Sequence, residues 1–155
     1  MLGAHGLRDA RTLLQSGNAV FRSAAPAAEL ERTLAARTHA TFGSEVDYFV
    51  RSAAEWSATI AANPFPLEAE RDPARTVAVL LAGTPSAAKV EALRAWIPGP
   101  ERIEARGAVL YAHYPNGQGT SKLTNAVIER KLGTRGTARN WNTMLKLAAL
   151  ASEFR

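Results

Sequence analysis

The chain has 155 residues, of which 46% are hydrophobic and 21% charged, and it carries a formal net charge of +5; this composition is typical of a soluble globular protein with one domain or two very small ones. No stretch of about 18 apolar residues and no signal-peptide pattern occurs, so we expect a cytoplasmic protein without a membrane segment. The sequence has no Cys, and its three histidines, His5, His39 and His113, lack the spacing of a metal motif, so we expect no disulfide, metal or cofactor.

The first expected elements are a β-hairpin and a long helix. Residues 12–15 and 19–22 are short strand-like runs, and residues 16–18 (Ser-Gly-Asn) suit the turn between them because Gly and Asn tolerate positive φ. Over residues 26–42 the apolar positions follow a helical period, and Gly43 is typical of a helix end.

A strand and a second helix are expected next. Residues 45–51 (EVDYFVR) alternate toward the pattern of a strand. The pattern Ser52-x-x-Glu55 predicts a capping box, in which each side chain accepts a hydrogen bond from the other residue's backbone N–H. The Asn-Pro-Phe-Pro of residues 63–66 ends this helix, because proline cannot continue the hydrogen-bond ladder.

A linker of mixed charge at residues 67–75 precedes a second block of elements. We expect a buried strand at 76–83, a helix at 86–97, a hairpin of residues 101–106 and 108–114, a helix at 121–132, an extended stretch at 134–139 and a final helix from Asn140.

The order of elements repeats along the chain. The second half reads β-α-β-β-α-β-α, and the first half reads the same without its leading strand and helix. A βαββαβ unit is the ferredoxin-like sandwich. We therefore expect an α+β fold of two tandem ferredoxin-like units with mainly antiparallel sheets, at residues 1–66 and 76–155, which could also pack as one compact domain. The alternative is that the repeat is coincidental.

The first unit is expected to lack its N-terminal strand. The leading strand of the second unit, from Val77, precedes Ile103 in the hairpin by 26 residues, whereas 11 residues precede the first hairpin. We therefore expect an N-terminal truncation of roughly 15 residues or more. An unpaired sheet edge would remain and could promote self-association.

Segment 114–123 (YPNGQGTSKL) is the first candidate ligand-binding site. Gly117 and Gly119 precede Ser121 and Lys122 at the expected start of a helix. Free N–H groups at a helix start bind anions, glycines permit close approach of a ligand, and the lysine adds a positive charge. The spacing is not that of a P-loop. The alternative interpretation is a turn, an N-cap and a solvated lysine.

Two further segments are candidates. Arg139 can bind a phosphate and the neighbouring Trp141 can stack on a base, with Asn140 and Asn142 beside them. Alternatively, Asn140 caps the last helix and Trp141 is a core residue. We favour the core position for Trp141. The tip of the first hairpin, with Ser16 and Asn18, could present amide groups to a ligand, although turn chemistry explains it equally well.

Basic residues are concentrated in the second half. The first 77 residues contain eight Lys or Arg and nine Asp or Glu, whereas the remaining 78 contain eleven and five. Such an excess attracts a phosphate-bearing small molecule or a nucleic acid. The alternative is that abundant Arg and Ala reflect a GC-rich genome. No catalytic set is evident, so enzymatic activity is uncertain and we favour a non-catalytic protein.

Several of these segments together resemble the bacterial domain-of-unknown-function family 1697 (DUF1697). The resemblance extends over essentially the whole chain and rests on the QSGN of residues 15–18 with Val20 and Phe21, the NPFP of 63–66, the YPNGQGTSKL of 114–123, and the RNWNT of 139–143 with Lys146 and Leu147.

The resemblance implies a two-unit α+β fold and no established activity, substrate or cofactor. Members of the family open with a strand and a GINVGG-like loop, which this chain lacks. The matching positions therefore inherit only the expectation of a shared site; they are Ser16, Asn18, Gly117, Ser121, Lys122, Arg139, Asn140 and Asn142.

Three hypotheses follow. The chain is a non-catalytic module that binds a phosphate-bearing ligand or nucleic acid through its basic second half, a small-molecule enzyme with a pocket for an anionic substrate between its two units, or a structural and interaction domain in which these motifs are only turns and caps.

Overall fold

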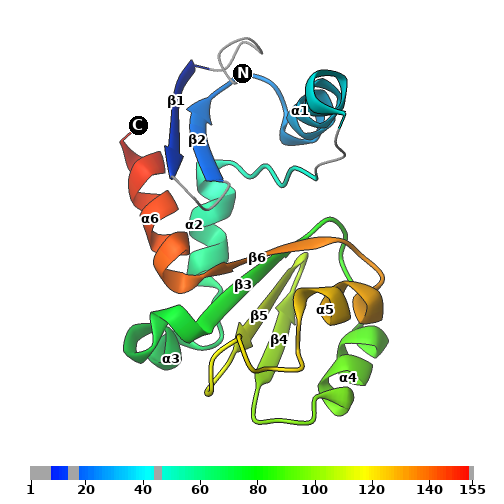
Figure 1. The fold of residues 1–155 in the computed structure, drawn as a ribbon. Helices are drawn as coiled ribbons and strands as arrows, with labels where there is room; N and C mark the ends of the chain where they lie inside the picture. The colour runs from blue at the N-terminus through cyan, green and yellow to red at the C-terminus, as the bar shows by residue number, and fades with distance from the viewer. Residues whose placement is uncertain (1–7, 14–17, 44–46, 154–155) are drawn as a thin grey trace. The chain divides into compact units, whose positions relative to one another are not determined.

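A computed structural model describes residues 8–13, 18–43 and 47–153 of the chain. The fold is α+β, with strands paired antiparallel (Figure 1). The chain divides into two compact units, one of residues 59–145 and another of residues 1–58 with 146–155, whereas the sequence led us to expect boundaries at 66 and 76. Each unit is described by itself.

The unit of residues 59–145 is built on a four-stranded antiparallel sheet. Its strands are β3 (Thr76–Leu81), β4 (Arg102–Arg106), β5 (Val109–His113) and β6 (Gly136–Asn140), in the order β4-β5-β3-β6. Helices α4 (Ala87–Trp96) and α5 (Asn125–Leu132) follow β3 and β5. The element order β-α-β-β-α-β, with the first strand in the interior of the sheet beside the third and fourth, is that of a single ferredoxin-like unit.

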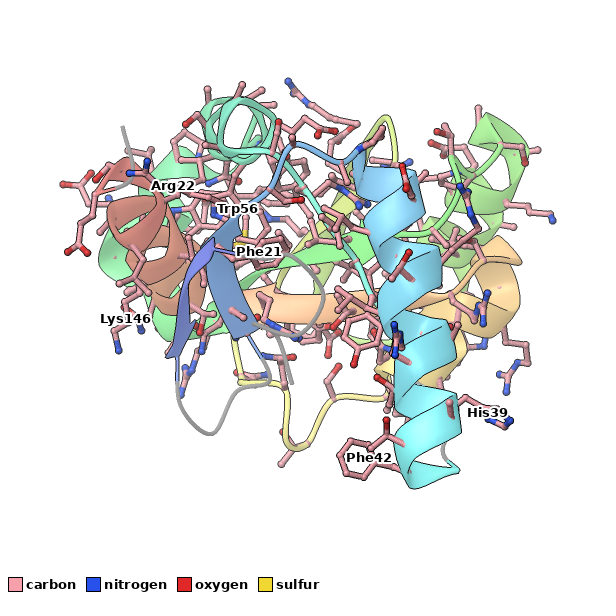
Figure 2. All side chains as sticks on the ribbon, turned by 90° about the horizontal axis from the view of Figure 1, so that it is seen from above. Phe21, Arg22, His39, Phe42, Trp56 and Lys146 are labelled. Carbon is pink, nitrogen blue, oxygen red and sulfur yellow. The ribbon has the colours of Figure 1, made fainter. Side chains whose placement is uncertain are left out.

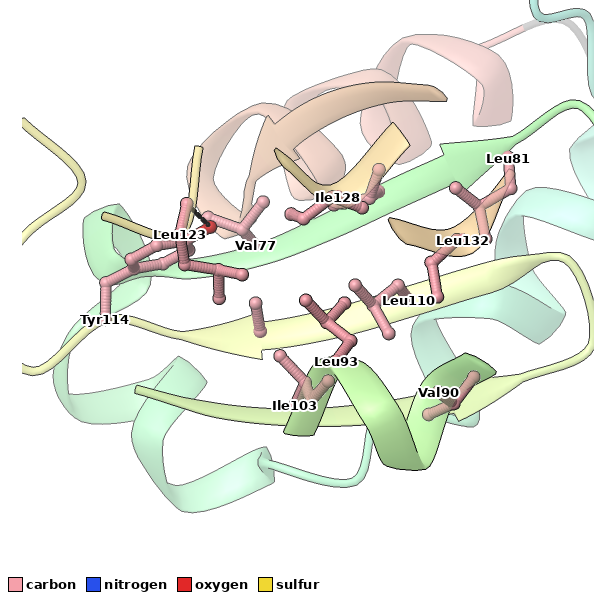
Figure 3. Close-up of a cluster of buried hydrophobic side chains, with 12 residues drawn as sticks. Val77, Leu81, Val90, Leu93, Ile103, Leu110, Tyr114, Leu123, Ile128 and Leu132 are labelled. Carbon is pink, nitrogen blue, oxygen red and sulfur yellow. Dashed lines mark hydrogen bonds between the residues drawn. The ribbon is translucent and has the colours of Figure 1, made fainter. Parts of the chain in front are cut away.

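One face of this sheet forms a hydrophobic core with α4 and α5 (Figure 3). Val77 and Val79 of β3 alternate toward the helices and meet Leu93 of α4 and Ile128 of α5, all at most 1% exposed. Because side chains alternate between the two faces of a strand, Ala78, which is fully buried, lies on the opposite face. The apolar run of β3 is therefore explained by burial on both faces.

Residues 59–75 also belong to this unit. The Tyr111 hydroxyl donates to the Thr59 carbonyl over 2.6 Å. Residues 67–75, expected as a linker, contain most of α3 (Pro66–Arg71) and the 3-10 turn Pro73–Arg75.

The other unit contains a β-hairpin and the longest helix. Strand β1 (Arg8–Leu13) pairs antiparallel with β2 (Asn18–Arg22), which confirms the expected hairpin, although β1 begins before residue 12, where its start was expected. The tip of the hairpin lies outside the described residues. Helix α1 (Ala27–Phe42) packs Leu30 and Leu34 against Phe21 of β2. His39 and Phe42 lie at the C-terminal end of α1 (Figure 2), where Phe42 is 65% exposed.

The strand expected at residues 45–51 is wrong for residues 47–51, which form no strand. Side chains of α1 bind this segment instead: Glu31 accepts from the Val50 backbone N–H over 2.8 Å, and the hydroxyls of Thr38 and Tyr48 lie 2.6 Å apart. Because the Val50 N–H is bonded to a helix side chain, it is not available to a neighbouring strand.

The remaining helices are α2 (Ala53–Ala61) and α6 (Trp141–Ser152), which contribute residues to both units. The predicted capping box precedes α2: the Ser52 hydroxyl accepts from the Glu55 N–H and the Glu55 carboxylate accepts from the Ser52 N–H. None of the helices in the described part of the chain has the length and apolar character needed to cross a membrane.

Candidate functional site

The loop after β5 contains the first set of predicted site residues. The Gly117 N–H donates to the Tyr114 carbonyl, with Gly117 at φ +83°, and the Arg75 guanidinium donates to the Pro115 carbonyl over 2.8 Å. A turn thus follows β5, and the hydrogen bond from Arg75 joins this turn to the segment before β3. Gly119 is exposed and has open space around it.

Ser121 is held by hydrogen bonds within this loop. Its hydroxyl donates to the Glu101 carboxylate over 2.7 Å and accepts from the Leu123 N–H over 3.0 Å. The Tyr114 hydroxyl donates to the Leu123 carbonyl over 2.9 Å (Figure 3). Burial, and secondarily the charge of Glu101, raise the pKa of Tyr114 to about 12. A carboxylate beside Ser121 disfavours an anion at this point.

The helix expected to start at Ser121 starts later, and that prediction is wrong. Helix α5 begins at Asn125, and the Thr124 hydroxyl caps it by accepting from the Val127 N–H over 3.2 Å. Ser121 and the exposed Lys122 therefore precede the helix. Since the field and free N–H groups of a helix start are confined to its first turn, they do not act at Ser121.

The residues after Thr137 lie on the edge strand β6 and at the start of α6. Arg139 donates to the Thr137 hydroxyl over 2.7 Å and to the Ala138 carbonyl over 2.8 Å, and burial lowers the pKa of its guanidinium. The Asn140 side chain caps α6 by accepting from the Thr143 N–H over 3.0 Å. Trp141 is 5% exposed, which confirms it as a core residue, and Asn142 is exposed.

The structure brings these two sets of residues to one end of the sheet. His113 pairs with Thr76 and Asn140 pairs with Val77, so the loop after β5 and the end of β6 are about 10 Å apart, two strand spacings. Arg139 pairs with Ala78, on the face opposite to α4 and α5.

Two of the predicted residues lie elsewhere. Asn18 starts β2 in the other unit, and Ser16 lies outside the described residues. Ligand binding by the full set stays a prediction.

A basic hollow lies at the opposite end of the sheet. It is shallow and open to solvent, with a volume of about 750 Å³, and is bordered by the residues after β3, by α5 and by the α5–β6 turn. Its lining consists of Ala82, Gly83, Ala126, Glu129, Arg130, Gly133, Thr134 and Arg135. Two arginines against one glutamate give this lining a positive charge.

Hydrogen bonds fix the floor of the hollow. The Thr134 hydroxyl accepts from the Gly83 N–H over 2.9 Å, and the Arg135 carbonyl accepts from the Ala82 N–H over 2.8 Å. The Glu129 carboxylate accepts from the Gly136 N–H over 3.0 Å, so a hydrogen bond within the turn stabilises its negative charge.

Lysine adds to the positive charge of the hollow. A Cβ placed on Gly133 would lie 2.8 Å from the Lys89 Nζ, so the ammonium group of α4 reaches this turn. The excess of basic residues in the second half is evident from the sequence, but this site is not. A signal was present, because Arg130, Lys131 and Arg135 cluster around Gly133 with Glu129 as the one acidic residue among them.

Comparisons with known proteins agree with this fold. The family described as "Protein of unknown function (DUF1697)" matches residues 1–111. A solved structure, that of the conserved bacterial protein SP0830 from Streptococcus pneumoniae, is similar with a TM-score of 0.72 and 18% identity over 97% of this chain and 84% of that chain. The search of curated proteins finds no match. Because the family match extends over more than half of its residues, the chain belongs to the DUF1697 family.

Proposed function

We propose that this protein is a non-catalytic module that binds a phosphate-bearing ligand in the basic hollow between α5, the α5–β6 turn and the residues after β3. The observation that carries the proposal is the presence of Arg130 and Arg135 in the lining of one hollow, with the Lys89 ammonium at its edge.

The chemistry of these side chains suits phosphate. A guanidinium group presents a planar set of donors that can bind two phosphate oxygens at once, and an ammonium group adds an adaptable point charge. Residues of the hollow come from the segment after β3, from α5 and from the turn that leads into β6, so their backbone is held by the sheet and by the Thr134 and Glu129 hydrogen bonds.

The loop around Ser121 is less suited to the same ligand. There the Glu101 carboxylate already accepts from the Ser121 hydroxyl, and its second oxygen is buried without a hydrogen-bond partner among the described residues. An approaching phosphate would meet a negative charge, whereas the one carboxylate of the hollow accepts a backbone N–H.

Calorimetric titration with pyrophosphate tests the proposal. We expect Arg130→Ala and Arg135→Ala each to weaken binding by about 10-fold or more, because a hydrogen bond to a charged group contributes about 1.5–3 kcal/mol. Arg106→Ala is the matched control, because Arg106 is exposed and lies on the face of the sheet away from α4 and α5. Equal affinity in the three variants and the parent would contradict the proposal.

We also propose that the two units are tandem copies of one ferredoxin-like design. In support, α1 and α5 both end at a glycine in the left-handed region, Gly43 and Gly133. The next helix after each glycine begins with a polar cap, Ser52 for α2 and Asn140 for α6. An experimental structure in which residues 18–61 superimpose on residues 109–149 would support this, and different connectivity would contradict it.

A further inference from the structure

Helices α4 and α5 expose a surface that combines positive charge with an aromatic ring. Trp96, at the end of α4, is 36% exposed, and the Lys131 Nζ lies 5.1 Å from the centroid of its ring. Lys131 neighbours Arg130, which lines the hollow, and Lys89 reaches Gly133 on the hollow's edge. Residues beside the hollow and residues beside the indole therefore come from the same two helices, α4 and α5.

The spacing along this surface can be derived from helix geometry. Lys89 and Trp96 are seven residues apart on α4, which is about 10 Å along the axis at about 1.5 Å per residue. About three nucleotides of a stacked strand, at about 3.4 Å each, span that length. A short strand can thus place a phosphate in the hollow while one of its bases reaches Trp96.

Basic side chains outnumber acidic ones in the two segments that form this surface. In residues 83–99 and 122–136 there are six basic residues and two acidic ones. The two acids are Glu91, which pairs with Arg94, and Glu129, which accepts from the Gly136 N–H.

We propose that the surface of Lys89, Trp96, Arg130, Lys131 and Arg135 binds single-stranded nucleic acid; this rests on the phosphate site proposed above. The basic groups bind backbone phosphates, and Trp96 stacks on a base. On binding, the flexible Lys131 side chain moves from the indole ring to a neighbouring phosphate. The indole favours this ligand over an acidic polypeptide, because every nucleobase offers a flat face on which an aromatic ring stacks.

Fluorescence anisotropy with a labelled oligothymidylate of about ten nucleotides, a length within the range of known sites, tests this proposal. We expect Trp96→Leu to weaken binding between about 5-fold and about 150-fold, the range for loss of one stacked base. Trp96→Phe, which keeps an aromatic face, should retain most of the affinity. Circular dichroism checks that each variant is folded.

The salt dependence of the affinity distinguishes the contribution of the basic side chains from that of the Trp96 ring. Lys89→Ala and Lys131→Ala should each reduce the slope of log affinity against log salt by about 0.7, whereas Trp96→Leu should lower affinity with the slope unchanged. Arg106→Ala should change neither.

Three outcomes would overturn the inference: oligothymidylate affinity that is unchanged in Trp96→Leu, equal affinity for polyglutamate, or no oligothymidylate binding at all. If pyrophosphate still binds and depends on Arg130 and Arg135 in any of these cases, only the nucleic-acid assignment fails. If pyrophosphate binding is also lost, the phosphate site fails as well.

Discussion

The hydroxyl of Tyr114 gives a sharp test of the packing at the end of the sheet. Tyr114 is 3% exposed, and its hydroxyl donates to the Leu123 carbonyl over 2.9 Å. Tyr114→Phe removes this donor and leaves the carbonyl unsatisfied. We expect the free energy of unfolding to fall by about 1–3 kcal/mol near neutral pH, the cost of an orphaned buried polar group.

The same substitution should also change the pH dependence of stability. Burial raises the pKa of Tyr114 to about 12, whereas an unfolded tyrosine has a pKa of about 10. Between these values the unfolded chain loses the proton and the folded chain keeps it, so stability is present below about pH 10 and is lost as the pH rises. At about pH 11 the parent should have lost about 1.4 kcal/mol that the Phe variant does not lose.

Urea unfolding of both proteins, followed by circular dichroism near pH 8 and pH 11, measures this double difference. The stability gap between parent and Tyr114→Phe should shrink by about 1.4 kcal/mol at the higher pH. A gap that stays constant, or a tyrosine absorbance titration that loses no late step in the variant, would refute the assigned burial of this hydroxyl.

Two further predictions concern stability and can be checked by urea unfolding. Leu93→Ala should lower the free energy of unfolding by about 2–5 kcal/mol, because Leu93 is fully buried between α4 and the sheet. Leu67→Ala, at a residue that is 61% exposed, should change the free energy of unfolding by no more than about 0.5 kcal/mol. Equal losses in the two variants would contradict the described core. Gly43→Ala should cost about 1 kcal/mol because φ is +69° at the end of α1. Gly119→Ala, with open space and no positive φ, should cost much less, and the reverse order would show that the end of α1 is misassigned.

The elements that could be predicted from the sequence carry their signals locally. Gly43 after α1 and the capping box at Ser52 act through bonds or conformations within three or four residues. For the same reason the strands and helices of residues 76–140 were predicted in the right order, with small errors at their ends.

The errors arose where partners distant in sequence decide the structure. Residues 47–51 alternate like a strand, but Glu31, 19 positions before Val50, accepts the Val50 N–H. Ser121 is a good capping residue, but its hydroxyl donates to Glu101, 20 positions away, and Thr124 caps α5 instead. Neither partner can be identified from spacing alone.

The sequence predicted that the site would be basic and would suit a phosphate, but it did not predict where the site lies. The basic stretch that contains Arg130 and Arg135 was evident from composition, but the sequence placed the ligand at Ser121 and Lys122 because a helix seemed to start there. The hollow depends on the turn between α5 and β6 approaching the end of β3, as the hydrogen bond from the Gly83 N–H to Thr134 shows. That hydrogen bond joins residues 51 positions apart.

A titration with pyrophosphate, followed by amide chemical shifts in a two-dimensional NMR spectrum, tests the central claim most directly. The proposed phosphate site predicts saturable shifts of the Gly83 and Gly133 amides, which lie in the hollow, and their loss in Arg130→Ala. Shifts confined to Gly117 and Gly119 would place the ligand in the loop after β5, and this result, or the absence of any saturable shift, would contradict the proposed site.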